Sequence, residues 1–174
     1  MSKALIAACL SLSCLLLVQC KPAPEAGKSE VGKSGTAKPN TQGGPDMGFD
    51  VKLSFTPAAL SALKAADDNY AVDASYYAYP TETSMSKANR LHQLELGDEE
   101  IGAYVSTTQV HITGNTVDRS LLTDIKGPAM VLVRAYSIAR VGNETDRLSC
   151  NNYRDTLERA QSGPVTLSCD IVKP

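Results

Sequence analysis

The sequence predicts a mainly β protein: an antiparallel β-sandwich with one to three short helices, preceded by a signal peptide and a disordered tether. Apolar and polar residues alternate with a period of two in several short segments after residue 48, and turn-forming residues separate these segments. Before residue 48, the composition is that of an export signal and a linker. Alternation indicates half-buried strands, and many short strands separated by turns are typical of sandwiches.

The first expected element is a secretory signal peptide over residues 1–19. Lys3 supplies a short positive segment, and an uncharged, mostly apolar run follows from Ala4 to Val18. This run has the length of a signal-peptide core and is short for a membrane span, which needs about 20 residues. A transmembrane anchor is the alternative, but the polar sequence beyond position 20 does not extend the apolar run.

The end of this signal resembles the lipobox of bacterial lipoproteins. The four residues are Leu17-Val18-Gln19-Cys20, and only Gln19 departs from the pattern, which has a small residue there. The resemblance implies cleavage before Cys20 and a diacylglycerol on its thiol. Because residue 21 is not Asp, it also implies the outer membrane rather than the inner one. The domain would then face the periplasm.

Residues 20–47 are expected to hold the lipidated cysteine and a flexible linker. Gly, Pro, Ser, Thr, Ala and Lys dominate this segment, in which Val31 and Met47 are the only large apolar residues. Such a composition cannot bury enough surface to offset the entropy lost on ordering the chain. The folded domain is therefore predicted to occupy residues 48–174.

A phosphate-binding pattern lies inside this linker. Residues 27–34, GKSEVGKS, match the G-x-x-x-x-G-K-[ST] sequence of a P-loop. A P-loop needs a strand before it and a helix after it, because the loop amides and the helix N-terminus hold the phosphates. The flanking sequences, rich in Pro and Gly, favour neither element, and we expect no nucleotide to bind.

The charge of the chain argues against a nucleic-acid partner. The formal net charge is -2, and the linker carries a slight positive excess, so the predicted domain is mildly acidic. Nucleic acids and anionic lipid surfaces attract basic proteins. We therefore expect the membrane to be reached through the lipid anchor alone.

Strands are predicted wherever the alternation holds. The clearest segments are residues 50–55, 70–77 and 164–172, and further candidates are 91–96, 101–106, 108–113 and 129–139. Segment 129–139 is expected to be central, because it has apolar residues on both faces. Val131, Val133 and Ala135 share one face, and Met130, Leu132 and Tyr136 share the other.

Short helices are predicted between some of these strands. The best candidate is Pro57 to Asp67, which Thr56 can cap and whose proline stands at the first helical position. Residues 120–126 and 153–161 have the composition for a further turn or two each.

The cysteines predict one disulfide. Of five cysteines, Cys9 and Cys14 leave with the signal and Cys20 carries lipid, so Cys150 and Cys169 remain. An even number of cysteines in an exported chain indicates a disulfide, although two buried thiols are the alternative. The bridge would join neighbouring strands and stabilise the fold by about 3 kcal/mol.

The sequence contains no recognisable catalytic, cofactor or metal motif, so we expect a protein that is not an enzyme. His92 and His111 are the only histidines, and both are predicted on strands with surface positions. Two acidic groups, Asp67-Asp68-Asn69 and Asp98-Glu99-Glu100, have no defined metal-ligand spacing and are interpreted as solvated turns rather than calcium sites.

Tyrosines gather in one predicted strand. If Tyr76 faces the core, the alternation exposes Tyr77 and Tyr79 on the opposite face. Tyrosine is enriched at protein interfaces, where its ring packs and its hydroxyl bonds at the edge. The alternative is that these rings only cover the outside of a sheet. The candidate partner-binding residues are Tyr77, Tyr79, Asp98, Glu99 and Glu100.

Four stretches of the domain resemble lipoproteins of Gram-negative bacteria. They are VDASYYAYP (72–80), LELGDEEI (94–101), KGPAMVLVRAYS (126–137) and the pair LSC…VTLSCDIV (148–172). Some lipoproteins of this kind are immunity proteins encoded beside antibacterial effectors, and they block incoming toxin in the periplasm. The resemblance implies a protein partner, a periplasm-acting effector toxin. The alternatives are an envelope-maintenance lipoprotein that binds glycan or another envelope component and, last, a hydrolase with an unrecognised site.

Overall fold

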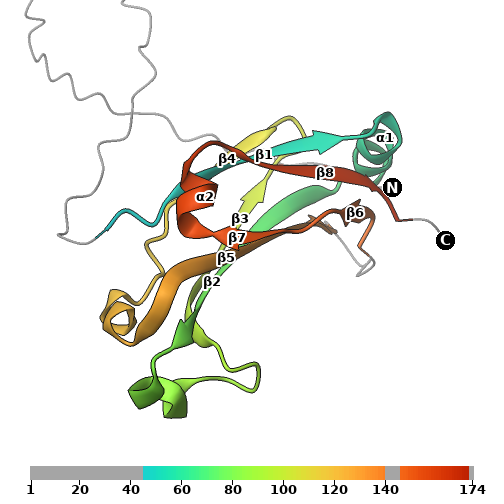
Figure 1. The fold of residues 1–174 in the computed structure, drawn as a ribbon. Helices are drawn as coiled ribbons and strands as arrows, with labels where there is room; N and C mark the ends of the chain where they lie inside the picture. Colours follow the sequence, from blue (N-terminus) through green and yellow to red (C-terminus); the bar gives the residue numbers. More distant parts are fainter. Residues whose placement is uncertain (1–44, 140–145, 173–174) are drawn as a thin grey trace, which may run out of the picture. The chain divides into compact units, whose positions relative to one another are not determined.

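Two four-stranded sheets pack against each other in the computed structural model, which describes residues 45–139 and 146–172 (Figure 1). The mainly β, sandwich-like fold predicted from the alternation is confirmed. The predicted signal peptide, the lipidation site at Cys20 and the GKSEVGKS segment lie outside the described residues.

One sheet has the strand order β4-β1-β8-β6. Its strands are β1 (Phe49–Phe55), β4 (Gln109–Ile112), β6 (Leu148–Cys150) and β8 (Val165–Ile171). The pairs β1–β4 and β6–β8 are antiparallel, but β1 and β8 run parallel. This parallel pair is the one departure from the antiparallel sandwich that the sequence predicts.

The other sheet has the order β3-β2-β5-β7, and its pairs are all antiparallel. Its strands are β2 (Asn69–Pro80), β3 (Leu94–Ala103), β5 (Ile125–Ile138) and β7 (Tyr153–Thr156). Strand β5, predicted to be central, lies between β2 and β7. Its apolar face meets the core, where Val131 and Val133 are fully buried and Ala135 is nearly so.

In the described residues the strands are connected by the short helices α1 (Pro57–Ala66) and α2 (Leu157–Gln161) and by the 3₁₀ helices η1 (Glu82–Lys87) and η2 (Arg119–Thr123). Helix α1 begins as predicted, because Thr56 Oγ1 accepts a hydrogen bond from the Ala59 amide at 3.2 Å. It ends at Asp67, whose left-handed φ of 53° stops the helical hydrogen bonding. Its buried side, Ala59 and Leu63, joins the core.

The predicted disulfide is present. Cys150 on β6 and Cys169 on β8 stand opposite each other in register and are bonded through their sulfur atoms. The chain between them passes through β7 and α2, so the bridge closes a loop that returns to the same sheet. It thereby ties the short edge strand β6 to its neighbour.

Two local predictions are wrong. Residues 98–100 do not form a turn, because 94–103 is one strand with a bulge where Tyr76 pairs with Gly97 and Tyr77 with Glu95. His92 lies in a turn with a φ of 58° rather than on a strand. Segment 153–161 contains the expected short helix, α2, but begins as the strand β7.

Met47, the last residue of the predicted linker, packs with the domain. The Met47 side chain is only 3% exposed, and its carbonyl accepts a hydrogen bond from the buried Tyr76 hydroxyl at 2.9 Å. Burial, with smaller effects from Glu99 and Asp46, raises the pKa of Tyr76 far above its usual range. Met47 is therefore a core residue that fixes the start of β1.

This attachment predicts the effect of a substitution at Gly114. The residue has a φ of 66°, and an added Cβ would lie 2.4 Å from the Met47 Cβ. We expect Gly114→Ala to lower the free energy of unfolding by about 2–4 kcal/mol in urea denaturation, from backbone strain plus overpacking. Gly163→Ala is the control, because nothing lies within 4 Å of its added Cβ, and it should change stability by less than about 0.5 kcal/mol. Equal losses in both variants would contradict this packing.

Candidate functional site

The candidate site is the side of the β3-β2-β5-β7 sheet that faces away from the core. The register of the four strands assigns its side chains, and we call this set the outer face. It comprises Ala71, Asp73, Ser75, Tyr77 and Tyr79 of β2, Glu95, Asp98 and Glu100 of β3, Lys126, Met130, Leu132, Arg134 and Tyr136 of β5, and Arg154 and Thr156 of β7.

These side chains form rows across the sheet, because residues paired between strands share a face. One row runs from Glu100 through Asp73 to Arg134. The next row runs from Asp98 through Ser75 and Leu132 to Arg154. Acidic groups thus lie toward β3, and cationic groups lie toward β5 and β7.

The first row is held by an ion pair. Arg134 donates to one Asp73 carboxylate oxygen, through Nε at 3.0 Å and through Nη2 at 2.5 Å. The Asp73 side chain is 14% exposed, and that of Arg134 is 50% exposed. Because half of the arginine faces water, the pair orders the surface more than it stabilises the fold.

A tyrosine beside this row bonds to β3. The Tyr136 hydroxyl donates a hydrogen bond to the Glu100 carboxylate. This bond, with smaller effects of desolvation and of nearby carboxylates, raises the pKa of Tyr136 to about 12. The two pairs line a hollow that continues to Ser149 and Cys150 of β6.

Tyr77 is buried, which corrects the prediction that it is exposed. Its side chain is on the outer face but is only 6% exposed. Arg154 Nε donates to the Tyr77 hydroxyl at 2.6 Å, and the guanidinium carbon lies 5.2 Å from the centre of the Tyr77 ring. The Tyr79 ring meets the Tyr77 ring edge-on, with 6.5 Å between centroids. Tyr79 itself is 48% exposed, as predicted.

The structure separates the acidic residues that the sequence groups together. Asp98 and Glu100 are on the outer face, but Glu99 points the other way. Its carboxylate accepts hydrogen bonds from the Thr113 amide at 2.8 Å, the Thr113 hydroxyl at 2.9 Å and the Gly114 amide at 2.7 Å. Glu99 therefore holds the loop after β4 and does not belong to the candidate site.

Sequence analysis missed two arginines of the outer face. Arg134 has the same parity as Met130, Leu132 and Tyr136, so the alternation of β5 contains the signal that places it. Arg154 carries no such signal, because its segment has the composition of a helix. Its contact with Tyr77 joins residues 77 positions apart in the chain.

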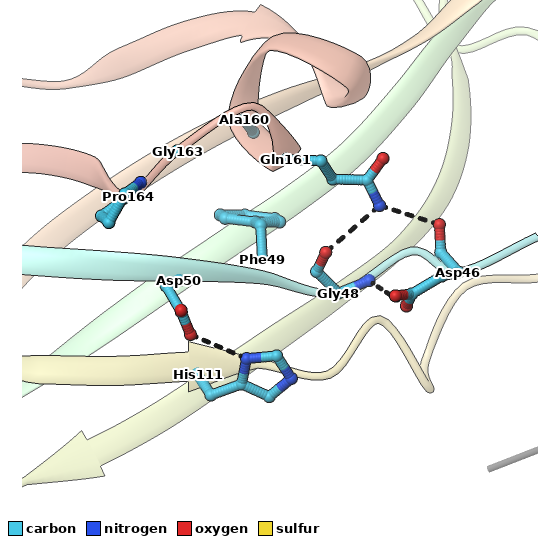
Figure 2. A pocket seen from close by; sticks show the side chains of 9 residues that line it. All are labelled: Asp46, Gly48, Phe49, Asp50, His111, Ala160, Gln161, Gly163 and Pro164. Atoms are coloured by element: carbon cyan, nitrogen blue, oxygen red, sulfur yellow. Dashed lines mark hydrogen bonds and ion pairs between the residues drawn. The ribbon is translucent and has the colours of Figure 1, made fainter. Parts of the chain in front are cut away.

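A second hollow lies beside the other sheet, and Figure 2 shows its lining. Asp50 of β1 and His111 of β4 face each other there, with 2.9 Å between Oδ1 and Nδ1. As predicted, His111 points outward, and its side chain is 64% exposed. The Gln161 side-chain amide donates hydrogen bonds to the Asp46 carbonyl at 2.9 Å and to the Gly48 carbonyl at 3.2 Å.

This hollow has a histidine and an orienting carboxylate but lacks a nucleophile. No serine, threonine or cysteine is among its lining residues, all of which belong to the described part of the chain. Nucleophilic catalysis requires that third group within hydrogen-bond reach of the base. The Asp50–His111 pair is therefore interpreted as a cross-strand surface contact.

Residues 45–139 and 146–172 contain neither a cluster of metal-ligating side chains nor a helix that could span a membrane. No group of three or more His, Cys, Asp or Glu side chains there is placed to hold a metal ion. No helix in these residues has the length and apolar character needed to cross a membrane.

Comparison with models of known protein families, with curated proteins and with solved structures finds no significant match to this chain. The outer face is therefore interpreted from its own chemistry.

The Tyr136–Glu100 bond predicts a titration at high pH. Because the pKa of Tyr136 is raised, the bond contributes stability below pH 10, which is lost as the pH rises through about 12. We expect ultraviolet absorbance titration to show a step near pH 12 that disappears in Tyr136→Phe. In Glu100→Gln, the step should move toward pH 10. If the titration curves of the wild type and of Tyr136→Phe were the same near pH 12, the Tyr136–Glu100 hydrogen bond would be refuted.

Proposed function

We propose that this chain is a membrane-tethered periplasmic lipoprotein that binds and neutralises a toxic antibacterial effector, as an immunity protein does. The observation that carries the proposal is the outer face, on which Tyr77, Tyr79, Met130 and Arg154 gather. Tyrosine, methionine and arginine are enriched in protein interfaces, and tyrosine and arginine supply many of the residues that dominate binding energy.

The order of these side chains also supports binding. Arg134 is held by Asp73, Tyr136 by Glu100 and Arg154 by Tyr77. Immobilising a long side chain on association costs about 0.5–1.5 kcal/mol. Side chains that are held before the partner arrives avoid part of that cost, so this face suits tight binding.

The charges of the outer face define the partner's surface. Asp98 and Glu100 lie toward β3, whereas Lys126 and Arg154 lie toward β5 and β7. A complementary effector surface presents cationic groups to the first pair and anionic groups to the second. Such a pattern selects one orientation of the partner and rejects others.

In this proposal the domain has no chemistry of its own. Neutralisation follows from occupying the effector, so it requires neither a nucleophile nor a cofactor. Lipidation of Cys20 would keep the domain at the outer membrane, facing the periplasm, where an incoming effector acts. A gene beside that of this chain is expected to encode the effector.

The partner-binding role predicts a contrast between two exposed tyrosines. Tyr79 lies on the outer face at 48% exposure, whereas Tyr104 lies in the turn after β3 at 72% exposure. We expect Tyr79→Ala to weaken binding of the purified neighbouring effector at least tenfold in isothermal titration calorimetry, because a central tyrosine anchor is lost. Tyr104→Ala should change the Kd by less than about twofold, since it removes a ring outside the face. The proposal would be refuted if the wild-type domain did not bind the effector. It would also be refuted if Tyr79→Ala and Tyr104→Ala changed the Kd equally.

The lipid anchor predicts where the protein fractionates. We expect Cys20→Ala to move the protein from the membrane fraction to the soluble periplasmic fraction, because no acylated thiol remains. Ser34→Ala, a substitution in the predicted linker, is the control and should leave the protein with the membranes. Membrane association of Cys20→Ala equal to that of the wild type would rule out this anchor.

A further inference from the structure

Arg154 is bonded differently from other arginines of the domain. Arg134 donates to the Asp73 carboxylate, and Arg147 donates through Nε to the Asp68 carboxylate at 2.6 Å. Arg154 instead donates through Nε to the Tyr77 hydroxyl, which is uncharged. Within the described part of the chain, its side chain forms no ion pair and no other hydrogen bond. Its charge is therefore not neutralised.

The guanidinium is nonetheless held in place. Strand β5 lies between β7 and β2, so the hydrogen bond from Arg154 to Tyr77 crosses β5 on the outer face. The Tyr77 ring also lies 5.2 Å from the guanidinium carbon, within the range of a cation–π contact. Because Nε is the atom used, both terminal nitrogens keep their N–H groups free. The two terminal nitrogens therefore present a pair of N–H donors, here called the fork, in a fixed and exposed position.

No carboxylate of the described residues forms an ion pair with this positive charge. Its nearest neighbours in the rows, Leu132 and Met130, are apolar. Asp155 adjoins it in the chain but is paired with the inward residue Val131, and its carboxylate accepts from the Thr156 amide at 2.7 Å. Asp98 and Glu95 lie on β3, and neither forms an ion pair with Arg154; the Glu95 carboxylate instead accepts a hydrogen bond from Asn89 Nδ2 at 2.9 Å.

We propose that Arg154 is the recognition point for an aspartate or glutamate carboxylate on the effector. A guanidinium with two free terminal nitrogens matches a carboxylate bidentately, and such pairs are stronger than neutral hydrogen bonds. Tyr79 packs beside this contact through Tyr77, and Tyr77 is the positioning residue that aims the fork. This inference rests on the proposed function and specifies the chemistry of the partner.

The first experiment needs no effector. Protein labelled with ¹⁵N in its arginines is titrated with an acetylated, amidated tetra-aspartate peptide, while the Nε–Hε signals are followed by NMR. We expect the Arg154 signal to shift and saturate, and the Arg134 signal to stay still, because Asp73 already occupies that guanidinium. In Tyr77→Phe, the apparent Kd for the peptide should rise about threefold or more with no change in melting temperature.

Matched probes test the specificity of this site. A tetraserine peptide should leave the Arg154 signal unshifted, and phosphatidylcholine vesicles with one quarter phosphatidylglycerol should not broaden it. Equal shifts at Arg154 and Arg134, no shift at Arg154, or a response to the vesicles alone would overturn the inference. The last result would assign the site to an anionic lipid surface.

The second experiment uses the neighbouring effector. Arg154→Lys keeps the charge but loses the bidentate fork, and we expect about tenfold weaker binding; Arg154→Glu should weaken it at least a hundredfold. Arg159→Lys on α2 is the matched control and should lie within twofold of the wild type. If the Arg154 variants bind the effector as tightly as the wild type does, the inference about Arg154 is overturned, but the proposed function is not. An effector that the wild type does not bind would contradict the proposed function, and the peptide titration would still decide the role of Arg154.

Discussion

The alternation of side chains along β2 is the constraint on which both the core and the outer face depend. This strand has neighbours on both sides, so each of its residues must face either the other sheet or solvent. Tyr70, Val72 and Tyr76 face inward and are essentially fully buried. Asp73, Tyr77 and Tyr79 consequently face outward, and there they organise the arginines of β5 and β7. A one-residue slip of β2 would exchange the two sets and destroy both.

The bulge in β3 makes that strand compatible with β2. Leu94 and Leu96 are buried, and continued alternation would turn Asp98 and Glu100 into the core with them. The extra residue at Leu96–Gly97 reverses the parity, so the acidic pair faces outward while the two leucines stay inside. Gly97 permits the reversal, because its φ is 149° and a Cβ there would lie 2.5 Å from the Thr116 carbonyl oxygen.

The sequence contains the information for most strands but for only half of the candidate site. Val51, Leu53, Val131 and Val133 face the core as their alternation predicts, because a strand with one buried face must separate apolar from polar side chains. The same rule fails at β3, because the bulge changes which alternate residues face the core. The sequence pattern of this one strand therefore resembles that of two strands. Burial of Tyr77 could not be predicted either, because its cover, Arg154, comes from a strand 77 residues away whose place in the sheet depends on topology. The rule that outward tyrosines are exposed fails when a neighbouring strand supplies a long side chain that lies across them.

We expect a protein partner to meet the outer face and not the exposed end of β8. Methyl cross-saturation NMR on the complex with the neighbouring effector tests it most directly, because the methyl groups of Met130 and Leu132 lie on the outer face while those of Ile171 and Val172 lie on and after β8. Irradiating the protonated effector is expected to attenuate the Met130 and Leu132 signals and to leave those of Ile171 and Val172 unchanged. Attenuation of Ile171 and Val172, with Met130 and Leu132 unaffected, would contradict it.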